Sequence, residues 1–144
     1  MIIALMTFLA SLGFGIIFDL KGLKLLVAAL NGMLGGIIYN LLLTSQGEMM
    51  ALFIASFSIL VFAAIMARII RCPTTILLIS ALVPLVPGGL MYETVLALID
   101  NDMMLALSFA LRTIYDVIAI VIGIVFASGL ELLISRLYKK ITIR

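Results

Sequence analysis

The stretch Pro84-Leu85-Val86-Pro87-Gly88-Gly89 interrupts a long apolar segment that runs from about Thr74 to about Ile99. Proline has no N–H to donate and crowds the carbonyl four residues earlier, while glycine adds backbone freedom and removes side-chain packing. Pro87 suits the first position of a new helix, where its missing N–H would have no partner in any case. The sequence therefore predicts two half-helices, over about 74–83 and 87–99, with a break between them.

The length of the half-helices predicts the depth of this break. About ten helical residues reach roughly 15 Å, which is half the hydrocarbon thickness of a bilayer. Irregular backbone at the midplane survives only where protein buries it or water lines it, and secondary transporters build substrate sites from broken helices. We therefore interpret Pro84, Pro87, Gly88 and Gly89 as substrate-binding residues, with the Gly88 and Gly89 amides holding a carboxylate. The alternative is a kink without a site, because proline kinks are common in membrane helices.

The composition is that of an integral membrane protein. The 144 residues are 66% hydrophobic and 11% charged, with a mean hydropathy of +1.43, whereas soluble domains have about 25% charged residues. The chain has no histidine, which excludes His-based metal sites, and its one cysteine cannot form an intrachain disulfide. It contains no phosphate-binding P-loop and no Gly-x-Ser-x-Gly or Gly-x-Gly-Asp motif. We expect no cofactor, no metal, no enzyme activity and no nucleic-acid partner.

Five apolar stretches have the length of about 20 residues that a membrane crossing requires. They cover about 2–18, 25–43, 49–67, 74–99 with its break, and 103–135. The last one is long enough that it must tilt, bend near Gly123 or Gly129, or extend into the cytoplasm. The predicted fold class is an all-α integral membrane protein with five transmembrane helices in a single domain, residues 1–144.

Basic residues predict the orientation, because cytoplasmic loops are enriched in lysine and arginine. Eight of the nine basic residues lie in the first loop, the third loop or the C-terminal segment: Lys21, Lys24, Arg68, Arg71, Arg136, Lys139, Lys140 and Arg144. Five crossings place these segments on one side of the membrane, and the loops with Glu48, Asp100 and Asp102 on the other. We predict an N-terminus outside and a C-terminus in the cytoplasm.

Small residues recur every four positions on three of the predicted helices. They are Thr7, Ser11 and Gly15; Ala28, Gly32 and Gly36; and Ala119, Gly123 and Ala127. Such stripes let helix backbones approach closely within a bilayer, so we expect them to face the interior of the bundle.

Arg112 and Asp116 are charged residues within the last predicted helix, four positions apart and on the same side as its small residues. Charge at the bilayer centre costs at least about 2.5–3.5 kcal/mol, so the pair requires an explanation. One interpretation is an internal ion pair that holds helices together. The other is functional, with Arg112 as a substrate counter-charge and Asp116 as a proton-coupling carboxylate.

Tyr92 and Glu93 follow the break by about one turn. Measured along each helix from its outer end, Glu93 is expected at a depth of about 10 Å and Arg112 at about 15 Å, so the two side chains could meet. Glu93 is then either a partner of Arg112, a residue that reaches for the outer interface, or a second proton-coupling acid. Tyr92 is either an interfacial tyrosine or a hydroxyl donor to the substrate.

The run Leu82-Val-Pro-Leu-Val-Pro-Gly88, with Tyr92 and a helix that ends in an acidic turn, resembles the threonine/serine exporter family. The likeness is to the C-terminal half of that family, which can be a separate small subunit, and in particular to the small subunit of a two-component exporter linked to succinate efflux. The turn 68–73 and the glycine-rich segment 31–36 fit the same pattern. The resemblance implies that Pro84, Pro87 and Gly88 belong to the transport site, and that a larger subunit supplies further helices.

These observations predict a membrane subunit of a secondary exporter for small carboxylate-bearing metabolites. The substrates expected are threonine and serine, or a dicarboxylate such as succinate, exported by proton antiport across a prokaryotic cell membrane. The expected partner is a larger membrane subunit or a second copy of the chain. The rival hypothesis is a scaffold subunit that does not transport, in which the break only receives a partner helix.

Overall fold

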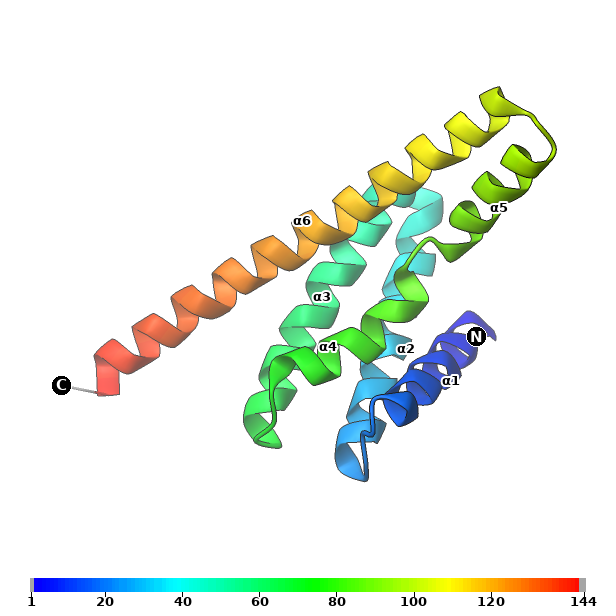
Figure 1. Ribbon diagram of the computed structural model, residues 1–144. Coiled ribbons are helices and arrows are strands. Elements are labelled where there is room, and N and C mark those ends of the chain that lie inside the picture. The colour runs from blue at the N-terminus through cyan, green and yellow to red at the C-terminus, as the bar shows by residue number, and fades with distance from the viewer. Residues whose placement is uncertain (1, 143–144) are drawn as a thin grey trace.

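The computed structural model describes the backbone of residues 2–142 and the side chains of residues 2–133, and every regular element in this part is helical. The first helices are α1 (Ile2–Ile17), α2 (Leu23–Gln46) and α3 (Glu48–Ile69). The segment with the break comprises α4 (Thr74–Leu82), a short 3₁₀ helix η1 (Val83–Leu85) and α5 (Gly88–Ile99). The last helix is α6 (Met103–Thr142) (Figure 1).

The centre of the fold is an antiparallel pair formed by α2 and α3 (Figure 1). Gly47 joins these helices with a φ of 82°, a backbone conformation that costs glycine little. α1 packs on α2, α4 packs against both central helices, and α6 packs on α3. α5 packs mainly on α6, so the two form a second antiparallel hairpin.

The predicted stripes of small residues are confirmed as the contact faces of the bundle. A Cβ atom at Gly32 of α2 would overlap Ser11 of α1, and one at Gly36 would overlap Thr7. A Cβ at Gly123 of α6 would overlap the Ser56 side chain on α3. Because hydrophobic burial does not drive helix association in lipid, this close backbone approach is what holds the helices together.

The break lies where the two prolines predict it. Pro84 cannot donate to the carbonyl of Ser80 and Pro87 cannot donate to that of Val83, so the α-helical ladder ends at Leu82. Val86 is extended, with φ −65° and ψ 132°, and the axes on either side differ by 48°. Pro87 precedes α5 as its N-cap and does not occupy the first helical position, which Gly88 takes.

Within the described part of the chain, three helices are long and apolar enough to cross a membrane: α2, α3 and the Met103–Leu133 part of α6. The bent pair of α4–η1 and α5 makes a fourth candidate span. α1 has 16 residues, or about 24 Å of helix, which is less than the hydrocarbon thickness of about 30 Å. The structure thus supports three to four crossings, and the predicted five-span topology stays a prediction.

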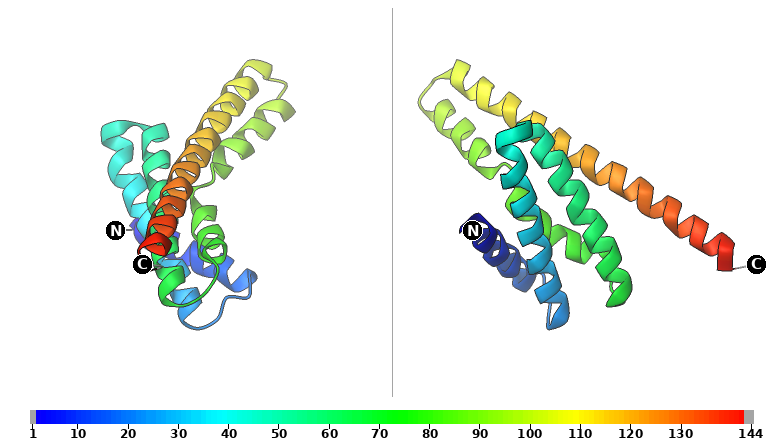
Figure 2. Two further views of the ribbon diagram at one scale, coloured as in Figure 1. Left: turned by 90° about the vertical axis from the view of Figure 1, so that its left-hand side faces the viewer. Right: turned by 180° about the vertical axis from the view of Figure 1, so that it is seen from behind.

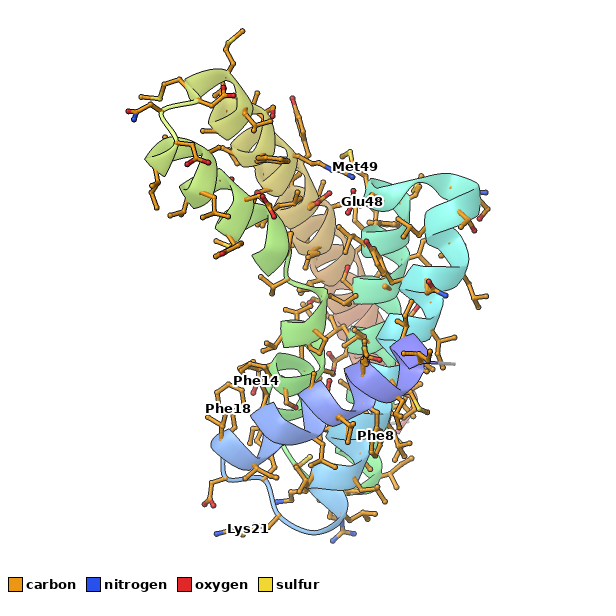
Figure 3. The ribbon with its side chains drawn as sticks, turned by 90° about the vertical axis from the view of Figure 1, so that its right-hand side faces the viewer. Phe8, Phe14, Phe18, Lys21, Glu48 and Met49 are labelled. Carbon is orange, nitrogen blue, oxygen red and sulfur yellow. The ribbon has the colours of Figure 1, made fainter. Side chains whose placement is uncertain are left out.

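The turns between successive helices alternate between the two ends of the α2–α3 pair (Figure 1). Lys21 lies at one end of the bundle and Glu48 at the other (Figure 3). The turn between α3 and α4 lies at the Lys21 end, where Arg68 and Glu131 form an ion pair of 3.8 Å between α3 and α6. The basic residues predicted beyond position 135 lie outside the side chains that the structure describes.

α6 is a single uninterrupted helix of 40 residues, or about 60 Å. It continues past Gly123 and Gly129 without a break and runs obliquely to α3, on which it packs (Figure 2). Of the three predicted ways to accommodate this length, the described backbone therefore combines an oblique course with an extension beyond residue 135.

Candidate functional site

A cavity of about 310 Å³ lies beside the helix break. All seven residues from Pro84 to Leu90 line it. Its other walls come from α1, α2, α3 and α6, which contribute Thr7, Tyr39, Glu48 and Asp116 among others. Four predicted substrate-binding residues, Pro84, Pro87, Gly88 and Gly89, thus share one cavity with the predicted coupling acid Asp116.

The first residues of α5, Gly88, Gly89 and Leu90, line this cavity. The Gly88 N–H donates to the Val86 carbonyl at 2.7 Å across Pro87, whose φ of −74° and ψ of 58° form a tight turn. The Gly88 amide is therefore occupied, which corrects the expectation that it holds a carboxylate. The Gly89 and Leu90 N–H groups have no acceptor among the described residues. They are the free donors of this helix N-terminus.

Asp116 is the buried acid of the site. Only 2% of the residue is exposed, and its Oδ2 atom has no hydrogen-bond partner among the residues whose side chains the structure describes. The predicted Arg112–Asp116 ion pair is wrong, because no salt bridge joins these residues in the described part of the chain. Asp116 lies one turn after Arg112 on α6 and lines the cavity at the break. The longer Arg112 side chain extends instead to Glu48 at the start of α3.

Glu48 is the actual partner of Arg112. Its Oε2 atom accepts hydrogen bonds from Arg112 Nε at 3.1 Å and from Arg112 Nη2. Its Oε1 atom accepts a hydrogen bond from the Tyr39 hydroxyl at 3.3 Å. One carboxylate therefore ties together α2, α3 and α6, at the end of α3 seen in Figure 3.

Glu48 and Tyr39 are site residues that no pattern in the sequence identified. Glu48 ends a polar run that predicts a loop, yet only Gly47 lies between the two helices and Glu48 is the first residue of α3. Tyr39 was one of several polar residues on the second helix with no pattern to distinguish it. Both roles depend on how α6 crosses the end of the α2–α3 pair, and no local signal in the sequence reports that crossing.

A second cavity, of about 380 Å³, lies at the α2–α3 turn. Its walls include Gly47, Glu48, Arg112, Tyr115 and Asp116. Glu48 and Asp116 line this second cavity and also the cavity at the break. The two cavities are therefore neighbours, separated by side chains of α3 and α6.

Tyr92 and Glu93 do not line either cavity. Tyr92 is 63% exposed, and Glu93 is also exposed. The predicted contact of Glu93 with Arg112 is absent from the described residues, because the Arg112 guanidinium is turned toward Glu48. The structure thus separates these two residues from the other predicted site residues.

Comparison with known families identifies the type of protein that carries this site. The family model described as Threonine/Serine exporter, ThrE, matches residues 3–130, which is most of the chain. The chain belongs to the threonine/serine exporter family. No curated protein and no solved structure in the comparisons matches it.

Membership in the threonine/serine exporter family and the apolar helices together point to a multi-pass membrane protein. The family is one of membrane transporters, which is not an enzyme class. Both cavities lie within the matched residues, since their walls come from positions between 3 and 116. The region matched by the family model thus contains every residue that lines either cavity.

Proposed function

We propose that this chain exports threonine, serine or a similar small amino acid, and that the substrate binds in the cavity at the helix break. The observation that carries the proposal is the chemistry of the cavity walls. Free N–H donors of Gly89 and Leu90 line the same space as the unpaired, buried carboxyl group of Asp116. A zwitterionic amino acid has a carboxylate for the N–H donors and an ammonium group for the Asp116 carboxyl group.

In the proposed binding mode, the α-carboxylate of the amino acid accepts hydrogen bonds from the Gly89 and Leu90 amides. The positive end of the α5 dipole favours this contact. The α-ammonium group binds the Asp116 carboxylate, which forms no salt bridge among the described residues because the nearby Arg112 is paired with Glu48. Both ends of the substrate are then satisfied in a site where unsatisfied charge is costly.

A dicarboxylate such as succinate fits these walls less well. Its second carboxylate would require a cation or further donors, and it would meet the acids Asp116 and Glu48. The nearby basic side chain is Arg112, which is engaged by Glu48 and does not line the cavity at the break. The geometry therefore favours amino acids over succinate.

Asp116 is also the proposed group for proton coupling. When the substrate leaves, the carboxyl group stays buried with no partner, and a proton can take the place of the ammonium group. Export of one amino acid would then alternate with inward movement of a proton. Glu93, the second predicted coupling acid, is exposed, so the structure gives it less support.

We further propose five crossings with the N-terminus outside, in a prokaryotic plasma membrane. The short α1 would span by local thinning of the bilayer. The transporter is completed by a larger membrane subunit or by a second copy of the chain. Support comes from the break itself, where Val86, Gly88 and Gly89 are exposed in the isolated chain, since irregular backbone at this depth requires protein or water around it.

The test is efflux from cells that lack their own amino-acid exporters and express this chain with its native partner. Cells loaded with labelled threonine or labelled succinate are diluted into label-free medium. We expect faster threonine efflux that depends on the chain and little change for succinate. Faster succinate efflux alone would overturn the substrate assignment, and no change for either substrate would favour the scaffold hypothesis.

A further inference from the structure

We infer that the Glu48–Arg112 ion pair is an outer gate, which closes the passage between the cavity at the break and the outer cavity at the α2–α3 turn. This inference rests on the proposed function, because it assumes that substrate moves from one cavity to the other. It assigns a role in transport to Glu48 and Tyr39 and a new one to Arg112.

The position of the pair is the first argument. Glu48 and Asp116 line both cavities, so they form a common wall. Arg112 lines only the outer cavity and reaches Glu48 across this wall. A substrate that passes from the break toward the α2–α3 turn must therefore move by the Glu48 and Asp116 side chains.

The composition of the pair is the second argument. Both Arg112 donors that bond Glu48 converge on one oxygen, Oε2, and no hydrogen bond of Arg112 Nη1 occurs among the described residues. The Arg112 side chain is 61% exposed, compared with 26% for Glu48. An arginine with spare donors that lies at a cavity mouth can release one carboxylate and accept another.

The anchoring of Glu48 is the third argument. The Tyr39 hydroxyl holds Glu48 Oε1 from α2, so the glutamate is fixed by two helices while Arg112 approaches from α6. Opening then requires Arg112 to move with α6, or to transfer from Glu48 to the carboxylate of the departing substrate. The second route provides a substrate-dependent gate, because only a ligand with a carboxylate can replace Glu48.

The structure also contains a matched control. Arg68 and Glu131 form another α3–α6 ion pair, with N···O at 3.8 Å, at the opposite end of the bundle. They line a separate apolar cavity that shares no residue with the two cavities of the proposed path. If ion pairs between α3 and α6 served only to fasten the helices, disrupting either pair would have the same effect.

The experiment measures accessibility of the inner cavity without any substrate. A Thr7→Cys reporter is placed in a Cys72→Ser background, because Thr7 lines the cavity at the break and tolerates a side chain of similar size. Membranes that contain the full chain and its native partner are treated with a hydrophilic thiol reagent on the side of the α2–α3 turn. We expect slow labelling of the reporter, faster by severalfold after Glu48→Gln or Arg112→Gln, and unchanged after Glu131→Gln.

The charge swap Glu48→Arg with Arg112→Glu tests the pair directly. We expect it to restore slow labelling, which general loosening of the fold would not do. Fast labelling of the parent, or equal rates in the parent and both single variants at normal abundance, would overturn the gate. Since labelling requires no substrate, that failure would leave the proposed amino-acid site in the inner cavity to be judged by the efflux assay.

Discussion

Asp116 and Gly89 line the same cavity although they belong to different helices, and each offers a polar group that no neighbour satisfies. For Asp116 this group is the buried Oδ2 atom, and for Gly89 it is the backbone N–H at the start of α5. Buried polar groups in native proteins nearly always have partners. Asp116 is an exception to this rule, whereas Gly89 is exposed and its N–H is one of the ordinary free donors of a helix N-terminus. A ligand with both an ammonium group and a carboxylate would satisfy both groups in the one cavity.

Filling the cavity at the break should stop transport without unfolding the protein. A Cβ at Gly89 would meet no atom within 4 Å, so a Gly89→Leu side chain has room to enter the cavity. We expect normal abundance in the membrane and loss of most threonine efflux. Gly129→Leu is the matched control, because its position is equally open but lies on α6 away from the cavity. Equal efflux in the two variants would contradict the site.

Neutralising the buried acid should weaken substrate binding. Asp116→Asn keeps the size of the side chain and removes its charge, so the ammonium group of the substrate loses a charged hydrogen-bond partner. We expect about 10- to 100-fold weaker threonine binding, equivalent to about 1.5–3 kcal/mol. The measurement is the threonine concentration that gives half-maximal counterflow in membrane vesicles. Glu93→Gln, on an exposed residue outside both cavities, should leave this concentration unchanged.

The contact between α1 and α2 should depend on a glycine. A Cβ at Gly32 would overlap Ser11, so Gly32→Ala forces the two helices apart. We expect a loss of about 1–3 kcal/mol, the usual cost of overpacking. Gly13→Ala on α1 meets no atom within 4 Å, so it should be neutral or slightly stabilising. Thermal unfolding of the purified variants in mild detergent compares the two, and equal midpoints would contradict the packing.

The proposed orientation can be tested with single cysteines. In a Cys72→Ser background, Gln46→Cys places a thiol at the α2–α3 turn and Lys21→Cys places one at the opposite end of the bundle. A thiol reagent that does not cross membranes should label intact cells at position 46 and not at position 21. The reverse pattern would invert the orientation that the basic residues predict.

Much of the fold could be predicted from the sequence because its determinants are local. Pro84 and Pro87 remove particular backbone donors, so the break in the fourth segment follows from chain chemistry alone. The stripes that include Gly32, Gly36 and Gly123 repeat every four residues, and this spacing identifies a contact face before the partner helix is known. The same spacing places Asp116 on the face of α6 that carries Ala119 and Gly123, and so predicts that this acid points into the bundle.

The ion pairing could not be predicted because it depends on the relative positions of distant helices. Arg112 and Asp116 are neighbours on one helix, which suggested a pair, but Glu48 lies closer to the guanidinium after α6 crosses the end of α3. The spacing of residues along α6 contains no information about that crossing. Likewise, the hydrogen bond from the Gly88 N–H to the Val86 carbonyl depends on the tight turn at Pro87. The residue types allow this turn, but they do not predict it.

The most direct test of the central claim is substrate protection at the helix break. Thr7→Cys in a Cys72→Ser background places a thiol in the cavity at the break, and its modification by a small thiol reagent is timed in membranes with and without ligand. The account predicts that threonine slows modification, that succinate does not, and that Asp116→Asn abolishes the protection by threonine. Modification that threonine leaves unchanged, or that succinate slows as much as threonine does, would contradict the claim that an amino acid binds between Asp116 and the start of α5.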